Sequence, residues 1–427
     1  MSIAIVALVI AAFAAAGLLI RASTERTGLG IWHPAVWWLG LSVVFFGIGS
    51  ARLAIDERFG PAVYVSGAVL AFALAVAGSD RLAGRLVASA SASGVSDADG
   101  RDRAEAIPLR PWVVAGLAAL GLALIAPTLL RVGLPFLAGD ITGARAELTG
   151  LPVQVLRVTV PALALVLVLG TRGHASIATA RRRGAAWIAV GLLVALDIVL
   201  ASRYLVAELL AVVLVGIGLA GWHLRPRRLA ALALVAILAF GGIQILRSYD
   251  QAAGRELAFA VERTINRVVL IQPRTLEALQ VAIPAEQPYF GGLTWVRRLG
   301  PGLGRPDIPN LGYWVYPRLF PGQEPPGYAA PGILGEAWAN FGPAGLALFL
   351  LLGVFAERLG AFLARRRRIT VDLVAGALLV VFLARTHALG VNGLAVLVAL
   401  VIAWRILAAG ELGATWRAGR DVLAWRA

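Results

Sequence analysis

The chain has 427 residues, of which 59% are hydrophobic and 15% are charged, and its mean hydropathy is +0.81. Soluble domains carry about 25% charged residues, so this composition excludes an ordinary water-soluble protein and predicts a membrane protein. The lack of cysteine excludes disulfides, thiolate metal sites and a cysteine nucleophile. The net charge of +15 comes from arginines that lie mostly between apolar segments. We therefore expect acidic lipid rather than nucleic acid as their partner.

Apolar segments recur along the whole chain, and each is long enough to cross a hydrocarbon core about 30 Å thick, which needs about 20 residues of helix. They lie near residues 2–20, 32–51, 60–78, 112–130, 153–170, 185–202, 204–222, 229–246, 342–363, 370–388 and 394–409. The first segment is predicted to be a transmembrane span, because no charged stretch of a signal peptide precedes it. The predicted fold is an all-α, polytopic membrane bundle of about eleven transmembrane helices.

Clusters of arginine predict how these helices are oriented. Arginines gather in residues 171–184, 223–228 and 365–368 and in the C-terminal tail, and all four clusters fall on one side of the membrane. The positive-inside rule makes that side cytoplasmic, which places the N-terminus outside and the C-terminus inside. Residues 79–111 include a low-complexity stretch of small and polar residues, so we expect a disordered cytoplasmic linker there.

Two polar segments are predicted to lie on the opposite, extracytoplasmic side. Residues 131–152 are rich in turn-forming residues. Residues 247–341 are far longer than an ordinary connection, include an amphipathic helical stretch around 256–279, and alternate aromatic residues with arginine, glycine and proline. Aromatic rings stack on sugar rings, and the arginine fork binds phosphate. This composition predicts one large ordered outer loop that contacts a phosphorylated glycan.

Three short segments resemble a known family. Residues 133–145, GLPFLAGDITGAR, are similar to a loop of the form G-I-P-L-L followed by D and A-R. Residues 335–345, GEAWANFGPAG, are similar to a G-E-x-Y-x-N-F-G-x-x-G entry into a late membrane helix, and the turn 202–203 is similar to a short S-R turn. In these segments and in its predicted topology the chain resembles the O-antigen polymerases, also called oligosaccharide repeat unit polymerases.

The resemblance implies a transferase in the bacterial cytoplasmic membrane that acts on undecaprenyl-diphosphate-linked repeat units at the outer leaflet. Such an enzyme moves the growing glycan from its lipid diphosphate to a sugar hydroxyl of the next unit, without a metal or a nucleotide cofactor. The implied partners are this lipid-linked glycan, membrane lipid and a protein that regulates chain length. No G-x-x-x-x-G-K motif is present, so we do not expect the reaction to be driven by ATP.

Arginines are the predicted ligands of the diphosphate, because negative charge develops on it as the glycosidic bond breaks. The candidates on the outer side are Arg145, Arg203, Arg318 and Arg385. Carboxylates that would support them are Asp140 beside Arg145, and Asp197 and Glu208 on the two helices that flank Arg203. These groups have a second interpretation, as a self-paired loop and as an ion-paired cap of a helical hairpin.

The base that accepts the proton of the acceptor hydroxyl is predicted to be Glu336 or His387. Glu336 lies in the best-matched segment and shares a helix face with Asn340, whereas a histidine has an unperturbed pKa near 6.5 that suits base chemistry. Each has an alternative role, since Glu336 and Asn340 can fix a helix junction by hydrogen bonds and His387 can be an interfacial residue. His33 and the other two histidines are predicted to face the cytoplasm, so they are excluded.

Three other functions remain open at this point. A polysaccharide ligase would share the donor and the topology and differ in its acceptor. Another lipid-linked-sugar glycosyltransferase would place an acidic pair in the first outer turn, where Asp56 and Glu57 lie between Arg52 and Arg58. Self-pairing within that turn is the simpler explanation. A flippase or transporter would carry charged residues or glycine and proline breaks at mid-span, but the ionisable groups here lie near the outer ends of the predicted helices.

Overall fold

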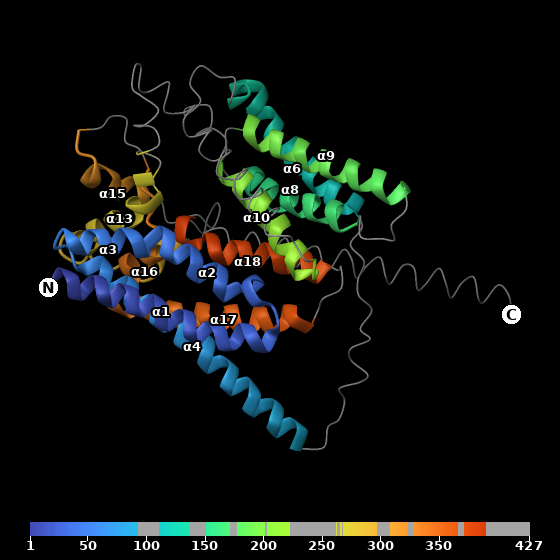
Figure 1. The fold of residues 1–427 in the computed structure, drawn as a ribbon. Helices are drawn as coiled ribbons and strands as arrows, with labels where there is room; N and C mark the ends of the chain where they lie inside the picture. Colours follow the sequence, from blue (N-terminus) through green and yellow to red (C-terminus); the bar gives the residue numbers. More distant parts are fainter. Residues whose placement is uncertain are drawn as a thin grey trace. The chain divides into compact units, whose positions relative to one another are not determined.

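The computed structural model describes eleven stretches of the chain, whose helices are shown in Figure 1. They are residues 1–92, 111–135, 151–170, 177–200, 203–222, 262, 265–266, 268–296, 308–322, 328–365 and 371–389. Every regular element in these stretches is helical, so the predicted all-α class is confirmed for them. The chain divides into two compact units. Unit 1 consists of Met1–Val95, Val261–Ala364 and Phe382–Asn392, and unit 2 of Ser96–Ala260, Arg365–Val381 and Gly393–Ala427.

The N-terminal half of unit 1 is a set of long helices. They are α1 (Ser2–Thr27), a 3-10 turn η1 (Gly30–Trp32), α2 (Pro34–Ser42), one π-helical turn η2 (Val43–Gly47), α3 (Ile48–Ile55) and α4 (Gly60–Ala92). Helix α1 packs against α4 and α3. Since α2, η2 and α3 follow one another without a break, they form one bent helix over the predicted span 32–51.

The C-terminal half of unit 1 consists of shorter helices followed by one long one. They are α13 (Ile271–Ala282), α14 (Leu293–Val296), α15 (Leu311–Leu319), α16 (Gly332–Phe341), the 3-10 turn η4 (Gly342–Gly345) and α17 (Leu346–Arg365). Pro343 lies in the first turn of η4, where its missing N–H is not needed. Gly342 has a φ of 58°, and a Cβ there would lie 2.5 Å from the Tyr289 ring, so this junction requires glycine.

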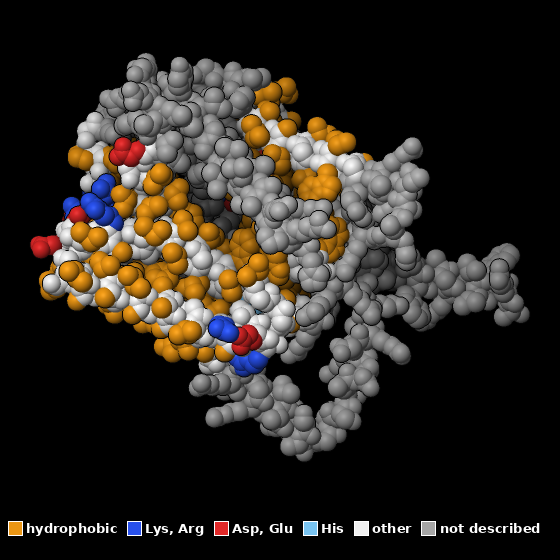
Figure 2. All heavy atoms as spheres, viewed as in Figure 1, with side chains coloured by type: hydrophobic (Ala, Val, Ile, Leu, Met, Phe, Trp, Pro, Cys, Tyr) orange, Lys and Arg blue, Asp and Glu red, His pale blue; other side chains and the backbone are white. Residues whose placement is uncertain are grey.

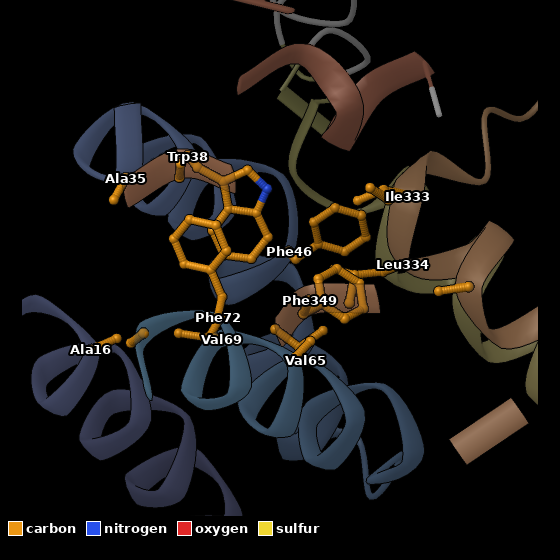
Figure 3. Packing of buried hydrophobic residues seen from close by; sticks show 14 of the residues in the cluster. Ala16, Ala35, Trp38, Phe46, Val65, Val69, Phe72, Ile333, Leu334 and Phe349 are labelled. Carbon is orange, nitrogen blue, oxygen red and sulfur yellow. The ribbon is translucent and has the colours of Figure 1, made fainter. Parts of the chain in front are cut away.

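Aromatic rings from three separate segments form the core of unit 1 (Figure 3). Trp38 on α2 stacks on Phe72 of α4 with ring centroids 3.9 Å apart, and Phe349 of α17 lies 6.0 Å from Trp38. Gly353 lets α4 and α17 approach closely, since a Cβ at this position would lie only 2.3 Å from the carbonyl oxygen of Phe72. Buried aromatic rings contribute most of the apolar area in such a core, so these contacts hold the two halves of unit 1 together.

In the part of unit 2 that the structure describes, there are four apolar helices and part of a fifth. They are α6 (Pro111–Val132), α8 (Leu151–Leu169), α9 (Ile177–Val199), α10 (Arg203–Leu219) and the first part of α18 (Val371–Leu389). Helix α8 contacts α6, α9 and α10. Gly216 lets α10 approach α8, because a Cβ there would lie 2.4 Å from Leu165. Small residues at such crossings are typical of helix packing in membranes.

Within the described stretches, four helical segments are long and apolar enough to cross a membrane: Ser2–Thr27, Pro34–Ile55, Gly60–Ser79 and Gly332–Ala364. Shorter apolar helices lie at further predicted spans, whereas the predicted spans 229–246 and 394–409 lie outside the described residues. On the face that Figure 2 shows, unit 1 is covered by hydrophobic side chains, and charged side chains gather at its two ends. An apolar band between two charged rims is the pattern expected of a protein that lies in a bilayer.

Two helices continue past the ends predicted from hydropathy. Helix α1 reaches Thr27 instead of residue 20, and α4 reaches Ala92 instead of residue 78. The first part of the predicted linker 79–111 is therefore helical, and residues 93–110 lie outside the described residues. Alanine, leucine and arginine favour helix even where mean hydropathy falls. The length of the apolar segments alone therefore underestimated the lengths of these two helices.

Candidate functional site

Helix α13, helix α15 and the turn between α3 and α4 meet at one end of unit 1, the end where α3 finishes in Figure 1. The Arg58 Nη1 atom of the turn lies 3.0 Å from Glu277 Oε2 of α13. Gln280, also on α13, donates from Nε2 to the carbonyl oxygen of Gly60 at 3.4 Å. Part of the segment 247–341 therefore packs onto the turn that the sequence places on the same side of the membrane.

Helix α13 has one buried face and one polar face. Leu276 and Leu279 are completely buried against other helices of unit 1. Arg274 and Glu277 are three residues apart, so their side chains leave the helix on the same side. The buried leucines fix this helix, and α13 is therefore a firm support for the two charged groups.

Close backbone contact at Gly49 positions α13 against α3. A Cβ at Gly49 would lie 2.1 Å from the carbonyl oxygen of Val269 and 2.7 Å from Pro273. Gly49 follows the π-helical turn η2, and such turns are often found near functional sites. Without a side chain at Gly49, the start of α13 lies directly on α3.

Helix α15 presents Arg318 in its last turn, where a positive charge interacts favourably with the helix dipole. Arg318 donates from Nη1 to the carbonyl oxygen of Trp314 at 2.8 Å, and its guanidinium carbon lies 3.8 Å from the centre of the Trp314 ring. Its Nη2 donates to Glu286 Oε2 at 2.6 Å. The arginine is thus held by a carbonyl, an aromatic face and a carboxylate.

The three elements surround a hollow of about 510 Å³. Five of its nine lining residues are charged: Arg58, Arg274, Glu277, Glu286 and Arg318. Three arginines and two glutamates give this lining a net charge of +1. Among the residues that the structure describes, none forms an ion pair or a hydrogen bond with the Arg274 side chain, so its guanidinium remains available to an anion.

Sequence reasoning identified only one member of this hollow, Arg318. Self-pairing within the turn was expected for Asp56 and Glu57, and Asp56 does lie 3.8 Å from Arg52, but Arg58 pairs with Glu277 of α13. In the sequence, Arg274 and Glu277 indicated only that one face of a helix is charged. Nothing in the sequence indicated that this face meets the α3–α4 turn, because the Arg58–Glu277 pair joins residues that are 219 positions apart.

Asn340 fixes a turn and does not face the hollow. Its Oδ1 accepts hydrogen bonds from the backbone N–H groups of Gly292 at 2.9 Å and Thr294 at 3.5 Å. Its Nδ2 donates to Thr294 Oγ1 at 2.6 Å and to the carbonyl oxygen of Glu336 at 2.8 Å. These contacts agree with the second interpretation given above, in which Asn340 secures a helix junction.

Glu336 is buried on α16, with 6% of its surface exposed, and it is not among the residues that line the hollow. The same helix is secured by Trp338, whose Nε1 donates to the carbonyl oxygen of Ile283 at 3.2 Å. The structure therefore does not bring Glu336 together with Arg318.

Two further candidate carboxylates lie in unit 2. Asp197 on α9 and Glu208 on α10 are both buried, and they are close enough to interact electrostatically. Arg203 is the first residue of α10, and its side chain is not among those that the structure describes. The same is true of the side chains of Asp140, Arg145, Arg385 and His387.

A second polar cluster lies at the opposite end of unit 1, where α1, α2 and α17 meet. The Ser23 hydroxyl donates to Glu357 Oε2, and His33 Nε2 lies 3.4 Å from Ser23 Oγ and 3.5 Å from Glu357 Oε2. His33 Nδ1 accepts the backbone N–H of Ala35 at 3.2 Å, so the imidazole proton lies on Nε2. His33 precedes the candidate span Pro34–Ile55, and burial lowers its pKa to about 4.

Serine, histidine and glutamate are the residue types of a hydrolytic triad, but their geometry here excludes one. The serine donates directly to the carboxylate, and the second histidine nitrogen is occupied by the backbone. Ser23 and His33 are fully buried, so no substrate reaches the serine oxygen. The cluster instead joins three helices. Among the described residues, no group of three or more histidines or carboxylates could hold a metal ion.

Comparison of the chain with protein-family models, with curated proteins and with solved structures finds no match. Function is therefore inferred from the chain's own residues and their arrangement.

Proposed function

We propose that the chain is a glycosyltransferase of the bacterial cytoplasmic membrane that polymerises undecaprenyl-diphosphate-linked oligosaccharide repeat units at the outer leaflet. The observation that carries this proposal is the hollow lined by Arg58, Arg274 and Arg318, at one end of a unit with helices long and apolar enough to cross a membrane. Three guanidinium groups around one hollow fit a diphosphate, whose oxygens accept paired hydrogen bonds from arginine. The apolar surface of the same unit suits the isoprenoid tail.

The reaction gives these arginines a direct role. The oxygen of an acceptor sugar hydroxyl attacks the anomeric carbon of the donor, and the bond between that carbon and the phosphate oxygen breaks. The electron pair of this bond goes to the diphosphate, where the arginines stabilise the growing negative charge. A hollow of about 510 Å³ is within the usual size range of small-ligand sites, which is about 300–1,000 Å³.

The acceptor is itself attached to a lipid diphosphate, so the reaction involves two such groups. Arg318 remains the diphosphate ligand predicted from the sequence, and Arg58 and Arg274 join it. Arg145, Arg203 and Arg385 remain candidates for the second diphosphate. A ligase would use the same donor and transfer it to a different acceptor, and a flippase would move the lipid without breaking the glycosidic bond.

The test uses the full chain in lipid nanodiscs. We expect inorganic pyrophosphate to bind the wild type, and Arg318→Lys to weaken this binding about ten- to hundredfold, because lysine keeps the charge but loses the paired donors. Arg21→Lys is the matched control, since Arg21 is exposed and pairs with Glu25 within α1. Binding would be measured by calorimetry and polymer formation by gel electrophoresis with purified lipid-linked repeat units.

Several results would contradict the proposal. If the wild type bound no pyrophosphate, or if single lysine variants of all three arginines made normal polymer, the hollow would not be the diphosphate site. Transfer of the glycan to a non-repeat acceptor would indicate a ligase. Translocation of the lipid-linked units across the membrane without new glycosidic bonds would indicate a flippase.

A further inference from the structure

The hollow contains two carboxylates beside its three arginines, Glu277 and Glu286. The proposed transfer needs a base that accepts the proton of the acceptor hydroxyl. This base must lie close to the diphosphate, because the anomeric carbon under attack is one oxygen atom away from the leaving phosphate. Glu336, predicted from the sequence, does not line the hollow, so the two glutamates that do line it are the better candidates.

Glu277 lies where such a base is needed. It is on α13, a helix held by the completely buried Leu276 and Leu279, and 23% of its side chain is exposed. It shares a helix face with Arg274 and lies 3.0 Å from Arg58. A diphosphate bound to these two arginines would lie in the same hollow as the Glu277 carboxylate. Catalytic groups on firmly packed helices keep their geometry better than groups on loops.

Glu286 is arranged differently. It lies in the turn that follows α13, 55% of its side chain is exposed, and its Oε2 accepts the Nη2 proton of Arg318 at 2.6 Å. Arg318 is also held by the Trp314 ring and the Trp314 carbonyl. The contact of Glu286 therefore orients an arginine, and Glu286 is a positioning residue.

We propose that Glu277 is the general base of the transfer reaction and that its ion pair with Arg58 is exchanged when the donor binds. This inference rests on the proposed function. Arg58 lies in a short turn with 53% of its side chain exposed, so it can turn from the carboxylate to the incoming diphosphate. The released carboxylate takes the proton of the acceptor hydroxyl as the new bond to the anomeric carbon forms. The old bond breaks with its electron pair on the diphosphate, and the proton passes from Glu277 to water.

Three variants in nanodiscs test this assignment. Glu277→Gln keeps the size of the side chain and removes its ability to accept a proton. We expect it to bind pyrophosphate at least as tightly as the wild type, and to form polymer about a hundredfold or more slowly, as is typical when a general base is lost. Glu277→Ala should lose activity similarly and recover part of it when formate is added. The matched control, Glu286→Ala, should not respond to formate.

Other outcomes would overturn the inference. A Glu277→Gln rate within about threefold of the wild type would exclude Glu277 as the base. Loss of pyrophosphate binding together with activity would show that Glu277 only positions Arg58. If Glu277→Gln did not insert or fold, Glu277→Asp would replace it. Because aspartate keeps the carboxylate but holds it one methylene group farther from the substrate, we expect slower polymer formation with pyrophosphate binding intact, and a rate equal to that of the wild type would exclude Glu277 as the base. Failure of the wild type to bind pyrophosphate would instead refute the proposed function.

Discussion

The His33 imidazole lies in surroundings that favour its neutral form. Its side chain is fully buried between α1, α2 and α17, and burial lowers its pKa from about 6.5 to about 4. The titratable group that faces it is Glu357, whose Oε2 lies 3.5 Å from His33 Nε2. Gly360 leaves room for this contact, since a Cβ there would lie 2.2 Å from His33 Nε2. Unfolding would expose the imidazole to water and restore its ordinary pKa.

This difference predicts that acid destabilises unit 1 through His33. The unfolded chain binds a proton at His33 below about pH 6.5, whereas the folded chain binds it only near pH 4, so stability is complete above pH 6.5 and falls as the pH is lowered toward 4. The loss should reach about 3 kcal/mol. We expect His33→Gln to remove most of this dependence, measured as thermal unfolding at pH 7.5, 5.5 and 4.5. Equal pH dependence in the two proteins would refute the assignment.

At the scale of single residues, the sequence predicted the chemical role that a side chain can have better than it predicted which other residue that side chain contacts. It identified Arg318 as a phosphate candidate and Asn340 as a residue with two alternative roles. It did not predict that Arg58 would pair with Glu277, because the two are joined only by the folding of distant segments. The sequence also excluded His33 from the outer site. It did not predict the buried contact of His33 with Glu357 of α17, because these residues too are distant in the chain.

Among the elements, the bent helix formed by α2, η2 and α3 determines where the arginine hollow is built. Its glycine at position 49 touches the backbone at the start of α13, and α13 carries Arg274 and Glu277. Any displacement of α13 from α3 would therefore move two of the charged groups of the hollow together.

Substitution of Gly49 tests this dependence. A Cβ at this position would lie 2.1 Å from the carbonyl oxygen of Val269, which is backbone and cannot rotate away. We expect Gly49→Ala to destabilise the protein by about 1–3 kcal/mol and to weaken pyrophosphate binding. Gly40→Ala is the matched control, because nothing lies within 4 Å of a Cβ on Gly40 and alanine favours helix. Both variants would be compared by thermal unfolding and calorimetry, and equal behaviour would contradict the predicted role of Gly49.

Apolar length predicted the existence of helices well. Nine of the predicted spans are helical in the described residues, and Glu336 and Asn340, which were expected to share a helix face, both lie on α16. The sequence did not predict how α13, α15 and the α3–α4 turn are packed together. Periodicity reports which face of a helix is apolar, and it does not report which distant helix will cover that face.

At the scale of the whole molecule, the length of α4 separates the two ends of unit 1. From Gly60 to Ala92 the helix extends about 48 Å at 1.5 Å per residue, more than the hydrocarbon thickness of about 30 Å. The arginine hollow lies near Gly60, at the start of this helix. If α4 crosses the membrane, the hollow and Ala92 lie on opposite sides of it.

The chain contains no cysteine, so a single introduced cysteine is the only thiol. With the arginine hollow outside, Pro321→Cys in the exposed turn after α15 should react with a membrane-impermeant thiol reagent added to intact cells. Ala92→Cys should react only after the cells are lysed, and mass-tag gel shifts would measure both. The reverse pattern would invert the predicted orientation, and equal reaction of both would show that α4 does not cross the membrane.

The aromatic core of unit 1 also has a consequence for synthesis of the protein. Trp38 packs between Phe72, which is made early, and Phe349, which is made late. About 250 residues separate the end of α4 from the start of α17, which corresponds to about 13–50 s of translation. During that interval the first helices leave the ribosome without the partners that complete their core. The bilayer, or an insertion chaperone within it, must cover the exposed face of Trp38 until α17 arrives.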